Sequence, residues 1–363
     1  MALTGNKGEW SEIYTLFKLL GDKKVYAGDE NLNKIEHLFY PILKVLRDEQ
    51  NQHYEYSVND ELIIVTENGE ELLKKPIGEF IDRAKSLFST IRQSNGTFAI
   101  PEIEQFMSEI GCKQLKAKST DKTDIRVVIH DLNTGMTPQL GFSIKSQLGA
   151  NSTLINAGPT TNIVYRIKGL EMSDIEMQKI NSMNKNNKMD LIGRIRYIYS
   201  KNLKLEFFKY QNDILEKNLM MIDTALPVII NKMLLNFYLT ESRTVIELIR
   251  DVEKENFLNF DIENYPYFYK RKVANMLVDS ALGMMPKKVW HGKYETTGGY
   301  LIVKEDGEVL CYHFYNRNLF ENYLLYNTAF ETPGKHEKNN FGIVYKIGDD
   351  YFINLELQVR FLK

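Results

Sequence analysis

The sequence predicts a mixed α/β (α+β) fold, in which a central sheet is flanked by helices. Three observations indicate this class: amphipathic segments come first, a hairpin of two apolar strands follows at 124–149, and a long helical stretch comes after it. That order favours a mixed sheet with helices packed against it. We therefore expect a core at 1–170, a mainly helical insertion at 171–289 and a small C-terminal α+β module at 290–363.

Composition narrows the class of protein. The 363 residues allow two or three subdomains, and 43% apolar with 26% charged residues is ordinary for a soluble globular protein. A formal charge of −2 argues against a protein that coats a polyanion, although a nuclease can confine its basic residues to one cleft. Cys112 and Cys311 belong to no CxxC pair, which fits a reduced cytoplasmic protein. No signal peptide or membrane span is predicted.

The first half of the chain reads as helices with short strands between them. Residues 7–20 have the apolar stripe of an amphipathic helix, formed by Ile13, Leu16 and Leu20. Residues 31–49 are expected to be helical with a break at Pro41. The remaining predictions are strands at HYEYSV and ELIIVT and helices at 77–93 and 101–110.

Beyond the hairpin, NIVYRIKG is expected to form a third strand of the core. The spacing of apolar residues predicts helices over most of 171–285, including the stretch 205–239. From 290 the pattern changes to a hairpin with an Asp-Gly turn, a helix and a closing hairpin.

The hairpin at 124–149 holds residues whose side chains could take part in catalysis. Asp124 opens its first strand, and the second strand, QLGFSIKS, carries Lys145 in an otherwise apolar run. Residues two apart in a strand share a face, so we expect one face to hold Ser143, Lys145 and Gln147 while the other packs Phe142 and Ile144.

An acid beside a lysine suits metal-dependent cleavage of a phosphodiester. Mg²⁺ held by one or two carboxylates neutralises phosphate charge and activates water, and a lysine stabilises the developing charge. If the two strands pair, Asp124 and Lys145 supply this minimum, with Gln147 placing a neighbour. The alternative is that Lys145 simply lies on an exposed strand face, because acid–lysine pairs at this separation are common.

The second acid of the site is missing from the hairpin. The PD-(D/E)xK nuclease pattern has an acid two residues before its lysine, where this sequence has Ser143. A second metal ligand must then come from elsewhere, and the candidates are Glu9, then Glu12, then Glu171. Alternatively, Glu9 and Glu12 lie in an exposed first helical turn, where the helix N-terminus favours acids.

Several residues are candidates for contacts to DNA. The polar segment after the hairpin offers hydroxyls and amides of the kind that bind phosphate oxygens and base edges, and a basic run lies further along. The alternatives are a capping and turn segment and a solvated basic surface. The candidates are Ser152, Asn156, Thr160, Thr161, Asn162, Lys270, Arg271 and Arg317.

Four stretches together resemble the HpaII family of type II restriction endonucleases: GNKGEWSEIY (5–14), FSIKSQLGANSTLINAGPTTNIVY (142–165), residues 298–333 and NLELQVRF (354–361). The resemblance implies a PD-(D/E)xK-type core and Mg²⁺-dependent hydrolysis of double-stranded DNA to 5′-phosphate and 3′-hydroxyl ends. It also implies a short palindromic target such as CCGG. In this sequence it assigns the catalytic strand FSIKSQLG with Lys145, the acid Asp124 and the helix-borne Glu9.

A palindromic target is most simply read by a homodimer. In a restriction-modification system the genetic partner is a cognate DNA methyltransferase. Two alternatives stay open. One is a structure-specific repair or junction nuclease with the same chemistry. The other is a non-catalytic DNA-binding module on a nuclease-like sheet, which Ser143 in place of an acid keeps possible.

Overall fold

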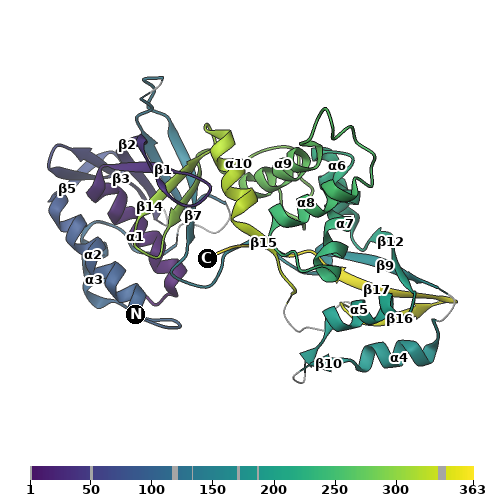
Figure 1. The fold of residues 1–363 in the computed structure, drawn as a ribbon. Coiled ribbons are helices and arrows are strands. Elements are labelled where there is room, and N and C mark those ends of the chain that lie inside the picture. The colour runs from purple at the N-terminus through teal and green to yellow at the C-terminus, as the bar shows by residue number, and fades with distance from the viewer. Residues whose placement is uncertain are drawn as a thin grey trace. The chain divides into compact units, whose positions relative to one another are not determined.

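The computed structural model describes residues 2–49, 52–116, 122–132, 134–169, 172–185, 188–333 and 341–363. The chain forms two compact units. The first consists of Met1–Ser152, Tyr294–Tyr323 and Lys363, and the second of Thr153–Lys293 and Leu324–Leu362. The colours in Figure 1 show that each unit combines segments from distant parts of the sequence.

A nine-stranded mixed sheet forms the first unit, in the order β1-β14-β13-β7-β6-β2-β3-β4-β5. β7 lies between β6, to which it is antiparallel, and β13, to which it is parallel. β1 pairs with both β14 and β2, which closes this part of the sheet on itself. The strands are β1 Lys24–Gly28, β2 Lys34–Glu49, β3 Gln52–Asn59, β4 Leu62–Glu67, β5 Glu70–Pro76, β6 Ile125–Ile129, β7 Gln139–Ser146, β13 Gly299–Val303 and β14 Val309–His313.

Helix α1 (Lys7–Asp22) is the central helix of the first unit. It contacts β1, β2 and β7 on one side and α2 (Ile77–Gln93) on the other (Figure 1). Asn6 and Glu9 form a capping box at its start, and nearly every residue from Trp10 to Gly21 is buried. α3 (Pro101–Glu109) adds Phe106, whose ring meets Phe17 of α1 edge-on. The helices predicted at 7–20, 77–93 and 101–110 are confirmed, and so is the mixed α and β class.

Residues 34–49 are extended, which corrects the expected helix at 31–49. Apolar residues there satisfy helical and strand spacing alike, so the pattern could not decide between them. Tertiary pairing decides: the first part of β2 pairs with β1, and the later part pairs with β6 and β3. Pro41, expected to break a helix, lies where the pairing passes from β1 to β6, and its carbonyl accepts the His130 N–H.

The second unit packs helices on a smaller sheet of order β12-β9-β17-β16, beside a three-stranded sheet of order β15-β18-β8 and a hairpin of β10 and β11. The helices are α4 Asp174–Ser182, α5 Leu191–Ser200, α6 Asp213–Ile222, α7 Leu226–Leu239, α8 Val245–Glu255 and α9 Phe268–Leu282, with the 3-10 turn η1 Pro159–Thr161. The strands are β8 Thr153–Ile155, β9 Asn162–Lys168, β10 Asn184–Lys185, β11 Lys188–Met189, β12 Lys204–Tyr210, β15 Thr328–Phe330, β16 Val344–Ile347, β17 Asp350–Glu356 and β18 Val359–Phe361.

Two sequence expectations for this unit need correction. The start of the expected helical stretch 205–239 is the strand β12, because Leu205 and Phe207 pair with Ile167 and Tyr165 of β9. The strand predicted at NIVYRIKG exists as β9, but it belongs to the second unit and not to the core. The N-terminal part of the first unit therefore ends at residue 152, and not at the expected residue 170.

The expected separate module at 290–363 is divided between the units. Its first hairpin, β13 and β14, completes the first sheet, whereas β16 and β17 complete the sheet of the second unit. Helix α10 (Arg317–Tyr326) spans the boundary at Tyr323. The cause is that β13 finds its backbone partners on β7, about 155 residues earlier, which local patterns cannot reveal.

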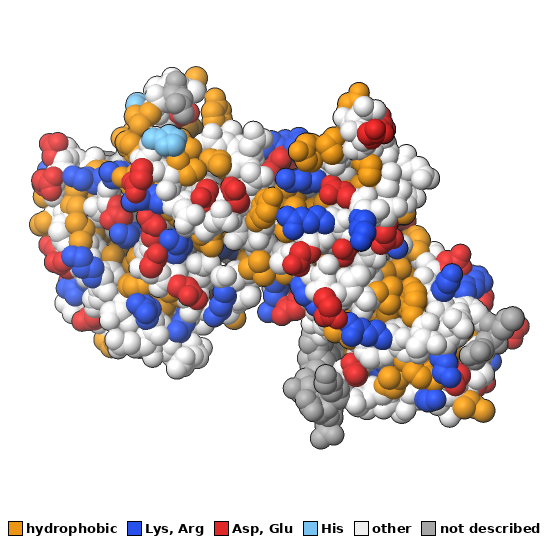
Figure 2. All heavy atoms as spheres, viewed as in Figure 1, with side chains coloured by type: hydrophobic (Ala, Val, Ile, Leu, Met, Phe, Trp, Pro, Cys, Tyr) orange, Lys and Arg blue, Asp and Glu red, His pale blue; other side chains and the backbone are white. Residues whose placement is uncertain are grey.

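On the face drawn in Figure 2, acidic and basic side chains are interspersed and no patch of one sign stands out. This agrees with the formal charge of −2. In the part of the chain that the structure describes, no single helix is long and apolar enough to cross a membrane; α6 and α7 meet that test only together, across a 113° bend.

We predict that Gly111→Ala destabilises the first unit by roughly 2 kcal/mol or more. Gly111 follows the C-cap of α3 with a φ of +76°, and an added Cβ would clash with the ring of the buried Tyr54. The measurement is the free energy of unfolding in urea.

Gly78→Ala in α2 is the matched control. Outside the adjoining residues and backbone of α2 itself, no heavy atom lies within 4 Å of the Cβ position there, so this change should stabilise by about 0.5–1 kcal/mol. Equal effects of the two substitutions would contradict the packing argument.

Candidate active site

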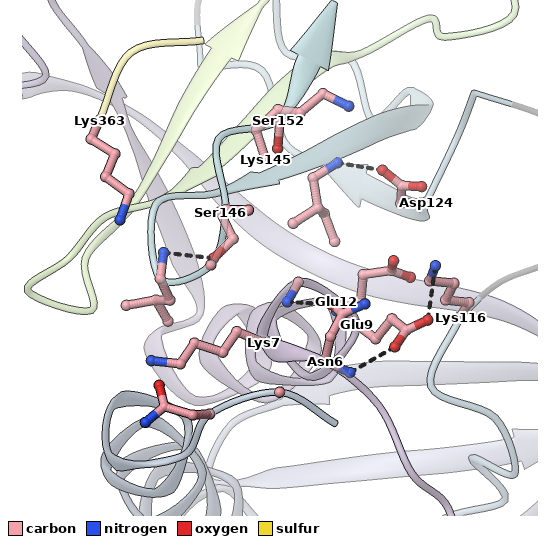
Figure 3. A pocket seen from close by; sticks show the side chains of 17 residues that line it. Asn6, Lys7, Glu9, Glu12, Lys116, Asp124, Lys145, Ser146, Ser152 and Lys363 are labelled. Carbon is pink, nitrogen blue, oxygen red and sulfur yellow. Dashed lines mark hydrogen bonds and ion pairs between the residues drawn. The ribbon is translucent and has the colours of Figure 1, made fainter. Parts of the chain in front are cut away.

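A pocket of about 850 Å³ opens in the first unit where the start of α1 faces the end of β7. Its wall carries carboxylates and ammonium groups together (Figure 3). The charged side chains that line it are Glu9, Glu12, Asp124, Lys7, Lys116, Lys145 and Lys363.

Asp124 is fixed by β7 although it precedes β6. Its N–H donates to the Phe142 carbonyl at 2.9 Å. Its Oδ2 accepts the Ile144 N–H at 2.6 Å and the Ser143 hydroxyl at 2.9 Å. Within the described residues, Oδ1 has no hydrogen bond, so this oxygen is available to a ligand in the pocket.

Lys145 meets Asp124 through a shared serine. Its Nζ donates to the Ser143 hydroxyl at 2.9 Å and lies 5.0 Å from the centre of the Tyr300 ring. Burial lowers the pKa of Lys145, and the negative charges of Asp124 and Glu12 oppose that shift. The expected convergence of residues 124 and 145 is therefore present, with one hydroxyl between the two side chains.

Ser143 stands where the nuclease pattern has an acid. It is buried at 4% exposure, and its hydroxyl donates to Asp124 while accepting from Lys145. A carboxylate could accept from the lysine but could not donate to a second carboxylate. The serine thus ties the acid and the lysine of the hairpin together and leaves room for a carboxylate from another element.

Two glutamates of α1 line the pocket, and they differ in their hydrogen-bond and ion-pair partners. Glu9 is occupied: its carboxylate accepts the Asn6 N–H at 2.7 Å and pairs with Lys116 at 3.0 Å. Burial by itself raises the pKa of Glu9, but these two partners outweigh it, and the pKa is lowered. The Asn6-x-x-Glu9 spacing is a capping-box signature, so the sequence did hold a signal that Glu9 is committed to the helix start.

Glu12 faces the acid of the hairpin. Within the described residues it has no hydrogen bond or ion pair. Burial, and then the negative charge of Asp124, raise the pKa of Glu12 to about 8. In Figure 3 its carboxylate lies between Asp124 and the Glu9–Lys116 pair.

These two carboxylates fit a divalent cation. A half-buried Glu12 beside Asp124 is a repulsive pair that a positive ion would relieve, and Asp124 keeps one oxygen uncommitted. The described residues contain no group of three or more His, Cys, Asp or Glu side chains arranged to hold a metal. A site of this kind suits Mg²⁺, which is often held by one or two carboxylates with waters and substrate oxygens as its other ligands.

The remaining predicted site residues are spread over the chain. Gln147 lies beyond the end of β7, does not line the pocket and donates its backbone N–H to Val303. Ser152 lines the pocket. Arg317 begins α10 and pairs with Glu321 at 2.6 Å. Glu171 lies outside the described residues.

The second unit holds the other candidates for DNA contact. Asn156 and Arg271 are exposed, Thr160 is half-buried, and the half-buried Lys270 lies over the Tyr267 ring. Two others are fully buried: the Thr161 hydroxyl bonds within its own turn to Gly158, and the Asn162 amide donates to Gln211 at 2.7 Å. The structure therefore gives Thr161 and Asn162 roles inside the fold, because neither is accessible to a duplex.

Sequence reasoning did not find three lysines of the pocket. Lys7, Lys116 and Lys363 come from segments far apart in the chain, and no motif links them to the hairpin. Lys7 begins α1, Lys116 follows α3 and Lys363 follows β18, so tertiary folding brings them to one cavity.

The fold and site define a class of protein. A sheet-borne acid and lysine, with a second acid from a helix around one pocket, form the arrangement of a phosphodiester-cleaving nuclease. Comparison with known proteins narrows this class. A family model for the HpaII restriction endonuclease matches residues 6–361. The type II restriction enzyme HpaII of Haemophilus parainfluenzae is 44% identical over 363 residues, which cover 99% of each chain.

No solved structure matches the chain. The chain belongs to the HpaII restriction endonuclease family. The resemblance noted from four short stretches is thereby confirmed over nearly the whole length, and the class is that of a type II restriction endonuclease.

We predict opposite effects on stability for the two glutamates of α1. Glu12 has a folded-state pKa of about 8 against 4.5 when unfolded, so the folded protein binds more protons between these values and loses stability as the pH rises. Glu12→Gln should remove this loss. In EDTA at pH 9 the variant should exceed the wild type by ~1–3 kcal/mol, and near pH 4.5 the difference should shrink toward zero.

Glu9→Gln is the control. The lowered pKa of Glu9 contributes stability above its unfolded value, and the substitution weakens the capping box, so at pH 9 it should cost about 1 kcal/mol. Urea unfolding across this pH range measures both. A Glu12→Gln variant that is less stable than the wild type at pH 9 would contradict the assignment.

Proposed function

We propose that this restriction endonuclease cleaves double-stranded DNA with Mg²⁺ held by Asp124 and Glu12, and with Lys145 acting at the reacting phosphate. One observation carries the proposal: Asp124, Ser143 and Lys145 form a hydrogen-bonded chain on one wall of a pocket whose other wall presents Glu12. Glu12 replaces Glu9 as the preferred second ligand, because Glu9 is already bonded to Asn6 and Lys116.

The bound cation would neutralise phosphate charge and supply an activated water. The remaining contributions to catalysis come from side chains of the protein. Ser143 holds the Lys145 ammonium and the Asp124 carboxylate in one orientation, so neither must reorganise during the reaction. The strand pairing fixes Ser143 opposite Tyr300 and Lys145 opposite Ile302, and the Tyr300 ring lies beside the ammonium group. Lys145 is thereby aimed at the pocket, where it can stabilise the charge that develops on a phosphate oxygen.

The remaining parts of the proposal rest on the family. We propose a short palindromic target such as CCGG, read by a homodimer, and a cognate DNA methyltransferase as the genetic partner in the cytoplasm. The PD-(D/E)xK classification is supported by the hairpin of β6 and β7 with its acid and lysine. Ser143 at the position of the second acid does not favour a non-catalytic module, because Glu12 supplies a carboxylate to the same pocket.

Digestion of phage DNA with Mg²⁺ tests the function. Discrete bands are expected from a restriction enzyme, smearing would indicate a nonspecific nuclease, and intact DNA would indicate a binding module. A preference for branched DNA would indicate a junction nuclease.

Lys145→Ala and Asp124→Asn should each reduce cleavage by ~10²-fold or more, because both remove charge from the reacting centre. Specific binding in Ca²⁺, measured by gel shift, should survive in Lys145→Ala. Lys85→Ala, an exposed lysine of α2, is the control and should cut normally. Cleavage by Lys145→Ala at the wild-type rate would refute the assigned role.

The choice between the two glutamates has its own test. Glu12→Gln should lose ~10²-fold or more in cleavage rate and require more Mg²⁺, whereas Glu9→Gln should lose less than about tenfold. The measurement is the single-turnover rate over a Mg²⁺ titration. The reverse order of effects would restore Glu9 as the ligand.

A further inference from the structure

The pocket is larger than the reacting group needs. Its volume is about 850 Å³, whereas a water molecule takes up about 30 Å³ in the liquid. One phosphate with its cation and waters fills only part of this space. The acidic side, with Glu12 and Asp124, is the part that the proposed chemistry uses. The rest of the cavity therefore has room for the nucleotides that flank the cleaved bond.

The lysines of the pocket divide into two groups. Lys116 is paired with Glu9, and Lys145 donates to Ser143. Lys7 and Lys363 form no ion pair with any residue that the structure describes. The Lys7 ammonium donates only to the Arg92 carbonyl, at 3.2 Å. Among the described residues, no aspartate or glutamate side chain pairs with the ammonium group of Lys7 or Lys363.

These two lysines lie away from the acids. In Figure 3, Lys7 and Lys363 reach toward one end of the pocket, while Glu9, Glu12 and Asp124 lie at the other. Two amides of the first turn of α1 are already bonded, because the Asn6 side chain accepts the Gly8 and Glu9 N–H groups at 2.8 and 3.1 Å. Leu148 and Gly149, which follow β7, also line the pocket, and a Cβ added to Gly149 would lie 3.4 Å from the Lys7 Cβ. The ammonium groups of Lys7 and Lys363 are therefore the positive charges that this end of the pocket offers an anion.

A DNA strand carries one charge per ~3.4 Å along the helix axis, so a phosphate bound at the acidic end brings a neighbouring phosphate with it. We infer that Lys7 and Lys363 bind the phosphate next to the cleaved one on the same strand and so position the strand along the pocket. This rests on the proposed function and adds a second phosphate site to it. Phosphate contacts of this kind fix the position of the DNA strand on the protein, but they do not recognise the base sequence.

The test is the salt dependence of binding to a cognate duplex in Ca²⁺, for Lys7→Ala, Lys363→Ala and the double variant. Because both lysines bind the same phosphate, the double variant should lower the slope of log K against log salt by about 0.9, and each single variant should lower it by less. KM should rise about tenfold in the double variant, with kcat within about threefold of the wild type. Lys85→Ala, which removes one exposed charge from α2, should leave the slope unchanged.

A neutral methylphosphonate at either phosphate adjacent to the cleaved bond provides the second measurement. One of these two substitutions should weaken wild-type binding and have no further effect on the double variant. Unchanged slopes in all lysine variants, or an undiminished methylphosphonate effect in the double variant, would overturn the inference. Lys363→Ala keeps the test decisive if Lys7→Ala disturbs the start of α1, and thermal melting identifies that case.

A failure of the proposed function can be distinguished from a failure of the inference about Lys7 and Lys363. If Asp124→Asn cleaves normally, the catalytic assignment falls, and with it the phosphate site. If Asp124→Asn is inactive and the slopes do not change, only the inference about Lys7 and Lys363 falls.

Discussion

The pairing of β7 between β6 and β13 is the constraint on which the site depends. Phe142 lies opposite Ile125 on one side and Gly299 on the other, and Ser143 lies opposite Tyr300. This register puts Phe142 and Ile144 into the core and turns Ser143 and Lys145 to the other face. Because successive residues of a strand face opposite sides of the sheet, a slip of one residue would exchange these two sets of side chains, so the packing of Phe142 and Ile144 enforces the register. The positions of the reactive side chains in the pocket therefore follow from the packing of the sheet.

The charge balance of the pocket follows from where α1 meets this strand. α1 is buried along nearly its whole length, which fixes its rotation and brings Glu12 toward Asp124. Burial, and then repulsion by the negative charge of Asp124, raise the pKa of Glu12. Lys116 offsets the neighbouring Glu9, and Lys145 is held by the serine. The pocket therefore contains one pair of acids whose charge the protein does not cancel, and that pair is suited to a cation.

Much of this arrangement could be predicted from local sequence. The apolar strands around the turn at 130–138 specified the β6–β7 hairpin, and strand alternation placed Ser143 and Lys145 on one face. Strand β2 was missed because its apolar spacing suits a helix equally well, and only pairing with β1, β3 and β6 decides the conformation. The division of the C-terminal segment was missed for a related reason, since β13 pairs with β7, a strand about 157 residues earlier in the sequence. Pairing between strands so far apart in the sequence produces no periodic pattern of apolar residues that could reveal it.

Glu9 and Glu12 show where sequence reasoning about a site stops. On a helix, residues three apart lie about 60° from each other around the axis, so both acids could face the hairpin. Their difference comes from their partners: Asn6 and Lys116 hold Glu9, and neither holds Glu12 by a hydrogen bond. An acid at position 143 would add a third negative charge beside Asp124 and remove the donor that Asp124 uses. Serine at that position is thus consistent with a carboxylate supplied by α1, and it makes the geometry of the site depend on the core helix.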